Sequence, residues 1–480
     1  MPTSSVSTWS TCMISRIARK EFTEMLRDGR FRLLAGMVLV ISILALAAGW
    51  KNYAELSRQH AAAQQETRDQ WLKQDKKNPH SAAHYGVYAF KPKSQLAMVD
   101  TGVDPYMGVA VWLEAHKQNE FKFRPAQDRT AVQRFGELTG AEVLQVLLPL
   151  FIVLMTFAAF AGEREQGTLR QLLSIGVSRR SLALGKALGV AMALGLILIP
   201  STVLAIVALA LSSENGLVSG DPARGVLLGL IYLLYFAVMI ALSLAVSARA
   251  RSSRLALVAL LSFWFANSLV ASRAASDIAG WLFPTPSAVE FQKAMEADLN
   301  NEAEMRERLD RRRAELLRQY NVDTIEALPI AFSGISMQEG EEHGNEVFDR
   351  HYGRLFDRYE QQNRVYQLGG VLAPLLSVRA LSMGLAGTDF DQHRHFATAA
   401  ESYRRDIQRV MNGDIAANQK RGQVYLADHT LWEQVPDFEY TAPSTTWVLT
   451  NHTISLSILV FWGVAASFFM LRSAVAAKVD

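Results

Sequence analysis

The sequence predicts an all-α polytopic membrane protein with six transmembrane helices and a largely helical extracytoplasmic domain built from two insertions. Three patterns predict it: long apolar runs, basic residues at alternate ends of those runs, and two long polar stretches between them. The runs occupy residues 33–50, 143–162, 187–212, 225–248, 255–272 and 447–471. About 20 helical residues cover the roughly 30 Å hydrocarbon core, where a helix satisfies its own backbone hydrogen bonds. Each run is therefore predicted to cross a membrane.

Lysine and arginine residues predict the orientation. They are concentrated in four segments, residues 1–32, 163–186, 249–254 and 472–480. The positive-inside rule places these segments on the cytoplasmic side. Both termini are then cytoplasmic. The other three connections, residues 51–142, 213–224 and 273–446, are predicted to lie on the outer side.

Composition agrees with alternating membrane and aqueous segments. Half of the 480 residues are apolar, the formal net charge is only +3, and the mean hydropathy is +0.08. The first apolar run is too long for a typical signal peptide and has no convincing cleavage pattern, so we interpret it as an uncleaved signal anchor. The single cysteine, Cys12, permits no intramolecular disulfide. No nucleic-acid motif is present, and no nucleic-acid partner is expected.

A seventh apolar segment, residues 368–387, needs a separate decision. Arg379 lies near its middle, where a charge costs roughly 2.5–3.5 kcal/mol on insertion scales, and Pro374 weakens it further. An additional crossing would also break the alternation that places the C-terminus inside. We expect this segment to be soluble or interfacial.

The extracytoplasmic insertions are predicted to be largely helical. Apolar residues recur at helical spacing within residues 287–320, 345–367 and 396–411. The first insertion is rich in aromatic and turn residues between 85 and 105, and its secondary structure is harder to assign from the pattern.

The loop after the second run has the most informative pattern. Glu163 and Glu165 open a short helix, and Leu169, Leu172 and Leu173 form one apolar edge of it. On periodicity alone, an amphipathic helix resting on the membrane surface is the ordinary interpretation. The alternative is a helix that lies against another protein.

The order of residues favours the second interpretation. Glu163-x-Glu165-x-Gly167-Thr168-Leu169, followed by Leu172-Leu173, resembles the corresponding loop of ABC type-2 permeases. In that family the loop is the coupling helix, and the resemblance implies that it docks in a groove of a separate ATPase. Residues 14–30 resemble the interfacial helix that precedes the first span in these transporters.

A narrower resemblance covers nearly the whole chain. His84–Pro92, Trp112–His116, Arg134–Leu138 and Ala386–Phe390 resemble the branch of these permeases with enlarged periplasmic insertions, which is named as a domain-of-unknown-function family. The resemblance implies a multi-pass permease of the bacterial inner membrane. It implies a second identical or related permease subunit and a separate ABC ATPase that binds ATP and magnesium. It does not imply a substrate.

Other candidate sites are weaker. Gly185-Lys186 lacks the first glycine and the Ser or Thr of a P-loop, so this chain is predicted to be non-catalytic and to bind no cofactor itself. An acidic and histidine cluster is compatible with a metal site or, as we favour, with a capped helix start: Asp389, Asp391, His393 and His395. Neither His343 beside Glu341 nor His116 beside Glu114 forms a facing acid–base pair on a helix.

The function predicted from the sequence is the permease subunit of an ATP-driven transporter, which couples hydrolysis by a separate subunit to translocation or extraction of a substrate. Two alternatives remain. One is an ATPase-coupled mechanotransmission or assembly subunit acting on periplasmic partners. The other is a membrane-anchored scaffold or receptor without transport.

Overall fold

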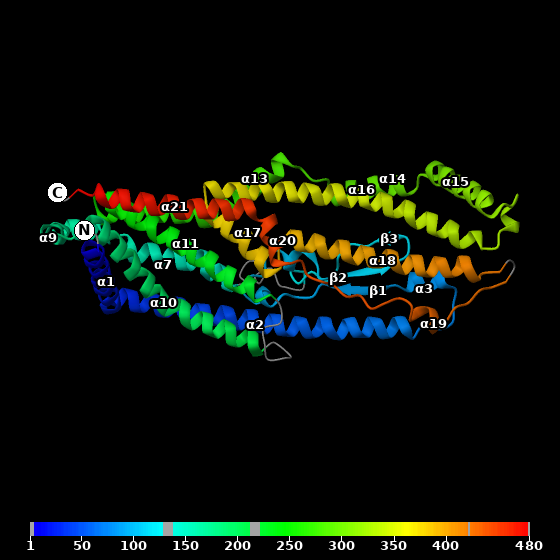
Figure 1. The fold of residues 1–480 in the computed structure, drawn as a ribbon, viewed down its shortest axis with the longest axis horizontal. Coiled ribbons are helices and arrows are strands. Elements are labelled where there is room, and N and C mark those ends of the chain that lie inside the picture. Colours follow the sequence, from blue (N-terminus) through cyan, green and yellow to red (C-terminus); the bar gives the residue numbers. More distant parts are fainter. Residues whose placement is uncertain (1–3, 128–137, 212–220, 421–422, 479–480) are drawn as a thin grey trace.

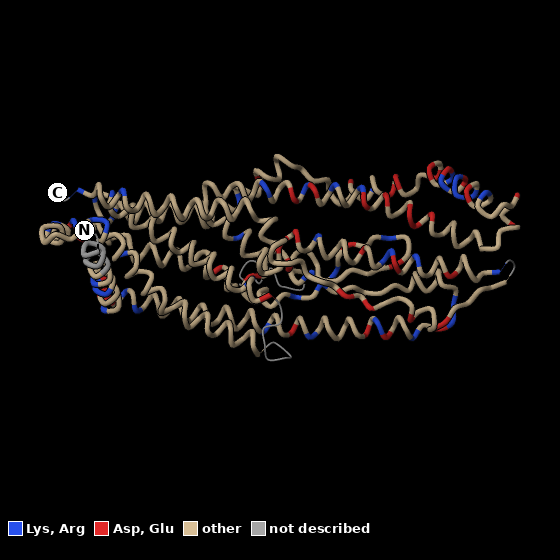
Figure 2. Tube along the Cα trace, viewed as in Figure 1, with Lys and Arg blue, Asp and Glu red and all other residues tan. Residues whose placement is uncertain are grey.

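The computed structural model describes residues 4–127, 138–211, 221–420 and 423–478. The Arg134–Glu137 part of one family-like motif and most of the predicted short outer loop, residues 213–220, lie outside these ranges. The molecule is elongated (Figure 1): both termini lie at one end, here called the termini end, and a distal domain occupies the opposite half. Charged residues are dense along the distal domain and sparse along the helices that lead to it (Figure 2).

Within the residues that the structure describes, six helical segments are long and apolar enough to cross a membrane, in agreement with the predicted fold class. They are Gly29–Leu72 (α2), Gly140–Glu165, Arg179–Leu211 (α10), Pro222–Arg249 (α11), Ser253–Leu282 and Thr453–Val475 (α21). The second comprises α6 (Gly140–Glu142), a π-helical turn η2 (Val143–Leu147), α7 (Leu148–Thr156) and α8 (Ala161–Glu165). The fifth comprises α12 (Ser253–Phe265), a π-helical turn η3 (Ala266–Val270) and α13 (Ala271–Leu282).

The N-terminal helix α1 (Ser4–Arg27) lies across the termini end and packs against α10. Two glycines of α10 make this close approach possible. A Cβ atom on Gly185 would lie 2.6 Å from Ile17 Cβ, and one on Gly189 would lie 2.7 Å from Glu21 Cβ. The short helix α9 (Thr168–Ser174) projects at the same end of the molecule (Figure 1).

The distal domain is built mainly from long helices. Helix α2 has 44 residues, about 66 Å at 1.5 Å per residue, so it continues well beyond the first predicted span. The second insertion supplies α14 (Ala288–Leu299), α15 (Glu302–Tyr320), η4 (Ile325–Ala327), α16 (Phe332–Leu368), α18 (Phe390–Asn418) and α19 (His429–Trp432). The short helix α20 (Thr445–Asn451) leads from it into α21. Helix α16 packs against α18 along the domain.

The first insertion also forms a small sheet that the all-α prediction did not include. Strands β1 (Val87–Phe90), β2 (Ala110–Glu114) and β3 (Lys117–Gln118) are antiparallel in the order β1-β2-β3, with Val87 opposite Leu113. The sheet contacts α2 and α18. The short elements around it are α3 (Pro79–Tyr85), η1 (Gln95–Met98) and α4 (Asp104–Met107). The core beneath includes Trp71 and Trp432, both fully buried.

The seventh apolar segment enters the helical bundle without forming a span. After a short turn η5 (Gly369–Val371), α17 (Pro374–Ala386) packs against α11 and α21. Its 13 residues are about 20 Å long, too short to cross the hydrocarbon core. The Arg379 side chain donates hydrogen bonds to Gln145 Oε1 (3.1 Å) and Ser272 Oγ (2.7 Å). Helix α17 therefore buries most of its apolar residues against protein, whereas Leu372 just before it is 84% exposed.

Candidate functional site

The loop at the termini end folds into two short helices joined at Gly167. Helix α8 ends at Glu165, and Gly167 adopts φ = +76°, a left-handed conformation that glycine accepts without a Cβ penalty. The Thr168 hydroxyl donates to the Glu163 carbonyl (3.2 Å), which fixes the start of α9 on α8. The joint lets the chain change direction between α8 and α9.

A buried lysine ties this loop to α1. Lys186 Nζ lies 2.8 Å from Glu21 Oε1 and 2.8 Å from Glu163 Oε1, and the Lys186 side chain is only 2% exposed. The ammonium group also lies 5.6 Å from the centre of the Phe160 ring, within the range of a cation–π contact. One cation thus joins α1, α8 and α10 where water is largely excluded.

Two arginines and one glutamate join the loop to three other helix ends. Arg164 donates to the carbonyls of Ala248 (2.6 Å) in the last turn of α11, of Ala250 just after it, and of Lys478 (2.9 Å) beyond α21. Arg179 donates to the carbonyls of Val475 (2.6 Å) and Ala477 (2.8 Å). Glu165 accepts from the Ser253 backbone N–H and hydroxyl, both at 2.8 Å, at the start of α12. Cations at helix C-termini and a carboxylate at an N-terminus are each favourable placements.

The apolar edge predicted for α9 faces the chain itself. Leu169 is 2% exposed, and Leu172 and Leu173 are partly buried against the same core. The surface left free contains Arg170, Gln171 and Ile175, and Ile175 is 75% exposed. Any partner of α9 therefore meets this polar face and its single large apolar side chain.

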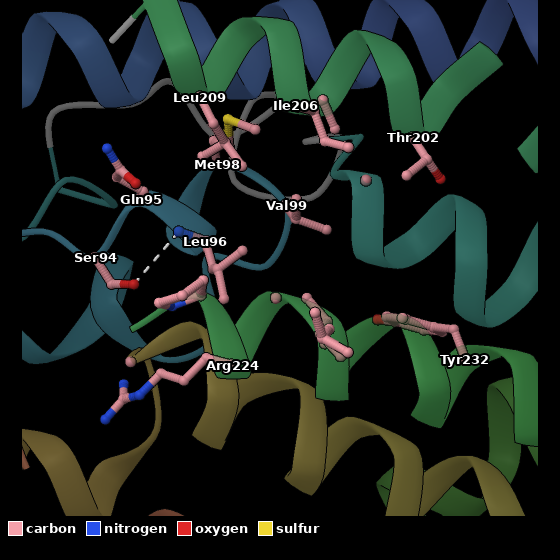
Figure 3. Close-up of a pocket in the computed structure, with 18 of the residues that line it drawn as sticks. Ser94, Gln95, Leu96, Met98, Val99, Thr202, Ile206, Leu209, Arg224 and Tyr232 are labelled. Atoms are coloured by element: carbon pink, nitrogen blue, oxygen red, sulfur yellow. Dashed lines mark hydrogen bonds between the residues drawn. The ribbon is translucent and has the colours of Figure 1, made fainter. Parts of the chain in front are cut away.

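A cavity of about 1000 Å³ lies between α2, α10, α11 and η1. Figure 3 shows Thr202, Ile206 and Leu209 of α10 facing the segment from Ser94 to Val99, with Tyr232 and Arg224 of α11 along another side. Most of the lining is apolar, as at Leu46, Leu198 and Leu228. Basic residues line it as well, including Lys91, Lys93 and Arg224.

These basic residues are held in place by partners. Lys91 Nζ lies 2.6 Å and Lys93 Nζ lies 3.7 Å from the Asp104 carboxylate. Arg224 donates to Gln392 Oε1 (3.1 Å) and to the Pro443 carbonyl. The cavity therefore combines apolar walls with basic side chains held by the Asp104 carboxylate and by hydrogen bonds, and Asp221 lines it as well.

The structure separates the predicted acidic and histidine cluster into two parts. Asp389 caps α18 by accepting from the Gln392 backbone N–H (3.1 Å), and its Oδ2 lies 3.3 Å from His452 Nε2. Ligating atoms of Asp389, Asp391 and His452 lie within 4.8 Å of one another. Burial, followed by the charge of Asp389, raises the pKa of Asp391 to about 6.

The two predicted histidines are directed elsewhere. His393 is buried with its ring centre 4.5 Å from that of Phe121, and burial lowers its pKa to about 3. His395 Nδ1 lies 3.0 Å from the Tyr440 hydroxyl. The sequence prediction grouped these histidines with the aspartates and missed His452, which lies between α20 and α21.

The remaining acid–base candidates are also rearranged by the fold. His116 Nδ1 lies 2.6 Å from Glu341 Oε1, whereas Glu114 accepts from Asn119. The contact joins residues 225 positions apart, which the local sequence pattern could not indicate.

Several residues of the termini-end network were not identified as site residues from the sequence. Glu21 was detectable, because it lies one turn after Ile17 and Ala18 on the apolar side of α1, where an acidic side chain needs a partner. For Arg164 and Arg179, which bind carbonyls of distant helix ends, no comparable local signal exists.

Comparisons with known proteins agree with this architecture. The ABC-2 family transporter protein description matches residues 15–310, and the domain of unknown function DUF3526 matches residues 288–441. The probable ABC transporter permease protein NosY of Pseudomonas aeruginosa is 38% identical over 126 residues, which represent 25% of this chain and 43% of that protein. The similarity thus spans less than half of this relative. Since the first family match covers more than half of the chain, the chain belongs to the ABC-2 family of transporter permeases and carries DUF3526 in its second insertion.

Proposed function

We propose that this chain is the membrane subunit of an ATP-driven transporter and that α9 receives the movement of a separate ABC ATPase. The observation that carries the proposal is the combination of a projecting α9 with the ion-pair network behind it. Leu169 anchors the helix to the chain, while Arg170, Gln171 and Ile175 remain available to a partner. ATP and magnesium bind to the ATPase in this proposal, and the present chain binds no nucleotide.

The network supports coupling because it distributes a displacement of α9 over several helices. Lys186 joins the loop to α1 and α10, Arg164 joins it to the ends of α11 and α21, and Glu165 joins it to α12. Charge-assisted hydrogen bonds are short and directional, so they resist separation better than apolar contacts that can slide. A push on α9 therefore moves the bundle rather than α9 alone.

Family membership supports the cellular setting of the proposal. In this proposal the chain lies in the bacterial inner membrane with both termini in the cytoplasm. It pairs with a second identical or related permease and with ATPase subunits. The distal domain then lies in the periplasm.

The cavity supports movement of a substrate. Its apolar walls and its Lys91, Lys93 and Arg224 side chains suit an amphiphile that carries an apolar chain and an acidic group. The continuous helix α2 favours a second function, in which ATP hydrolysis moves the distal domain to act on periplasmic partners. If ATP hydrolysis moves the distal domain but displaces no amphiphile from the cavity, the result favours that second function.

The test is purification of the chain from its native membrane in mild detergent, with mass spectrometry of the proteins that remain bound. We expect an ABC ATPase to be recovered, and we expect Ile175→Glu together with Arg170→Glu to abolish its recovery. Val424→Glu is the matched control, because Val424 is an 86% exposed apolar residue outside the termini end. Equal recovery with the double variant would refute docking at α9. Absence of any ATPase under conditions that preserve other membrane complexes would favour a scaffold or receptor.

A further inference from the structure

Three histidines of the first insertion converge in the distal domain. His80 and His84 lie one turn apart on α3, and His116 lies in the turn between β2 and β3. His80 Nε2 is 3.2 Å from His84 Nε2 and 3.1 Å from His116 Nε2. The centres of the three rings are 4.8, 4.9 and 5.0 Å apart.

These separations are close to those of ligands on one ion. A tetrahedral metal with metal–nitrogen bonds of about 2.0–2.1 Å places its nitrogen ligands about 3.3–3.4 Å apart. Hydrogen bonds alone satisfy the three nitrogens less well, because one N–H of His80 would have to be shared between both neighbours. A cation among the three rings accepts a lone pair from each.

A carboxylate orients the third ring. His116 Nδ1 lies 2.6 Å from Glu341 Oε1, so the proton of a neutral His116 belongs on Nδ1 and the Nε2 lone pair faces the other histidines. Glu341 is itself buried and lies 3.4 Å from Arg404. Metal-binding histidines commonly donate their other ring N–H to such a carboxylate.

The backbone around His116 is also fixed. Its φ angle is +63°, in the left-handed region that non-glycine residues rarely adopt. Its backbone N–H donates to both oxygens of Glu341 at 3.2 Å. Ring and backbone are therefore held by the same carboxylate.

The three histidines can be reached from outside the chain. His84 and His116 are exposed, whereas His80 is partly buried. A fourth coordination position is thus accessible to water or to a ligand from another molecule.

We propose that His80, His84 and His116 bind one divalent transition-metal ion of the Zn²⁺ type, with Glu341 as the positioning residue for His116. Imidazole nitrogen is a preferred ligand of such ions, whereas calcium and magnesium prefer oxygen. The ion links α3 to the β2–β3 turn. Through His116 and Glu341, it also connects the first insertion to α16 of the second, so metal binding stabilises the distal domain across its two insertions.

The test uses the full chain in detergent, purified without a histidine tag, stripped with a chelator and then titrated with Zn²⁺ alone. We expect one Zn²⁺ per chain after gel filtration, measured by elemental mass spectrometry. His84→Gln should weaken binding by more than about 100-fold, since it removes a ligand rather than an outer-shell partner. His84 is exposed, so this substitution disturbs no core packing.

His429→Gln is the matched control, because His429 is another exposed histidine of the distal domain. It should leave the stoichiometry and affinity unchanged. Co²⁺ bound to the same chain should give the strong visible absorption of a tetrahedral site, and His84→Gln should remove it. Less than stoichiometric Zn²⁺ in the unmodified chain, or equal binding by the His84→Gln and His429→Gln variants, would overturn the proposal.

Discussion

Replacing Lys186 by methionine removes the cation that holds two largely buried glutamates together. Glu21 and Glu163 have side chains only 11% and 14% exposed, and each has a carboxylate oxygen 2.8 Å from Lys186 Nζ. Methionine keeps most of the side-chain volume but leaves the two carboxylates facing one another. The expected result is a weaker attachment of α1 and α8 to α10.

The structure sets the size of this effect. The two carboxylate oxygens are at most about 5.6 Å apart, twice their common distance to Nζ, and two unit charges at that separation repel by about 3 kcal/mol at an effective dielectric constant of about 20. Breaking a buried ion pair from one side commonly costs about 3–5 kcal/mol. Lys20, which lies 3.5 Å from Glu21 and 3.9 Å from Glu163 and is half-exposed, places the expected cost at the lower end of that range.

Thermal unfolding of the purified chain measures the loss. The unfolding entropy of 480 residues is about 1 kcal/mol/K, so a cost of about 3 kcal/mol lowers the midpoint by about 3 °C. Adding Glu163→Gln to Lys186→Met should recover part of the loss, because one of the opposed charges is gone. Lys420→Met, at an exposed position outside the network, is the control. An unchanged midpoint for Lys186→Met, or an equal loss in the single and double variants, would refute the electrostatic reasoning.

Three other predictions concern separate parts of the molecule. Gly185→Leu should displace α1 and expose it to added protease, while Gly225→Leu, where no atom lies within 4 Å of the added Cβ, should not. Asp391→Asn should raise the unfolding midpoint at pH 7.5 but not at pH 4. The pKa of Asp391 in the folded chain, about 6, exceeds the ordinary aspartate value of 3.8, so Asp391 reduces stability as pH rises through that window, by at most about 3 kcal/mol. A gain that persists at pH 4 would contradict this assignment. Trp432→Ala should cost about 3–5 kcal/mol, measured by the same unfolding assay, because the Trp432 side chain is fully buried and its indole N–H donates to the Gln74 carbonyl at 3.3 Å.

The features predicted correctly from the sequence depend on local, additive properties. Six spans follow from apolar runs because each residue contributes its own transfer free energy, whatever the neighbouring helices do. The family resemblance rested on short contiguous motifs, and the family matches confirm it. Both kinds of signal are complete within a few tens of residues.

The features that were missed depend on contacts between distant segments. Leu169 and its neighbours show an apolar edge, but the pattern does not say whether that edge covers the chain or a partner. Strands β1 and β2 have only four and five residues, too few for a clear alternation among the turn residues around them. The His80-x3-His84 spacing is a recognisable ligand pattern on a helix, but His116 and Glu341 join it only in three dimensions.

Helix α2 gives the two ends of the molecule a physical connection. No proline or glycine interrupts it between Trp50 and Leu72, so this part of the helix can carry a displacement without bending at a weak point. Its distal half is bound to the sheet, since Thr67 Oγ1 accepts from the Tyr88 backbone N–H at 3.0 Å. Gly49 lies against the Met98 carbonyl, where a Cβ atom would not fit, so the helix is closely held there as well. A shift of α2 relative to η1 must therefore change the contact between Gly49 and the Met98 carbonyl. The distal half of α2 carries the sheet, α3 and the three histidines with it.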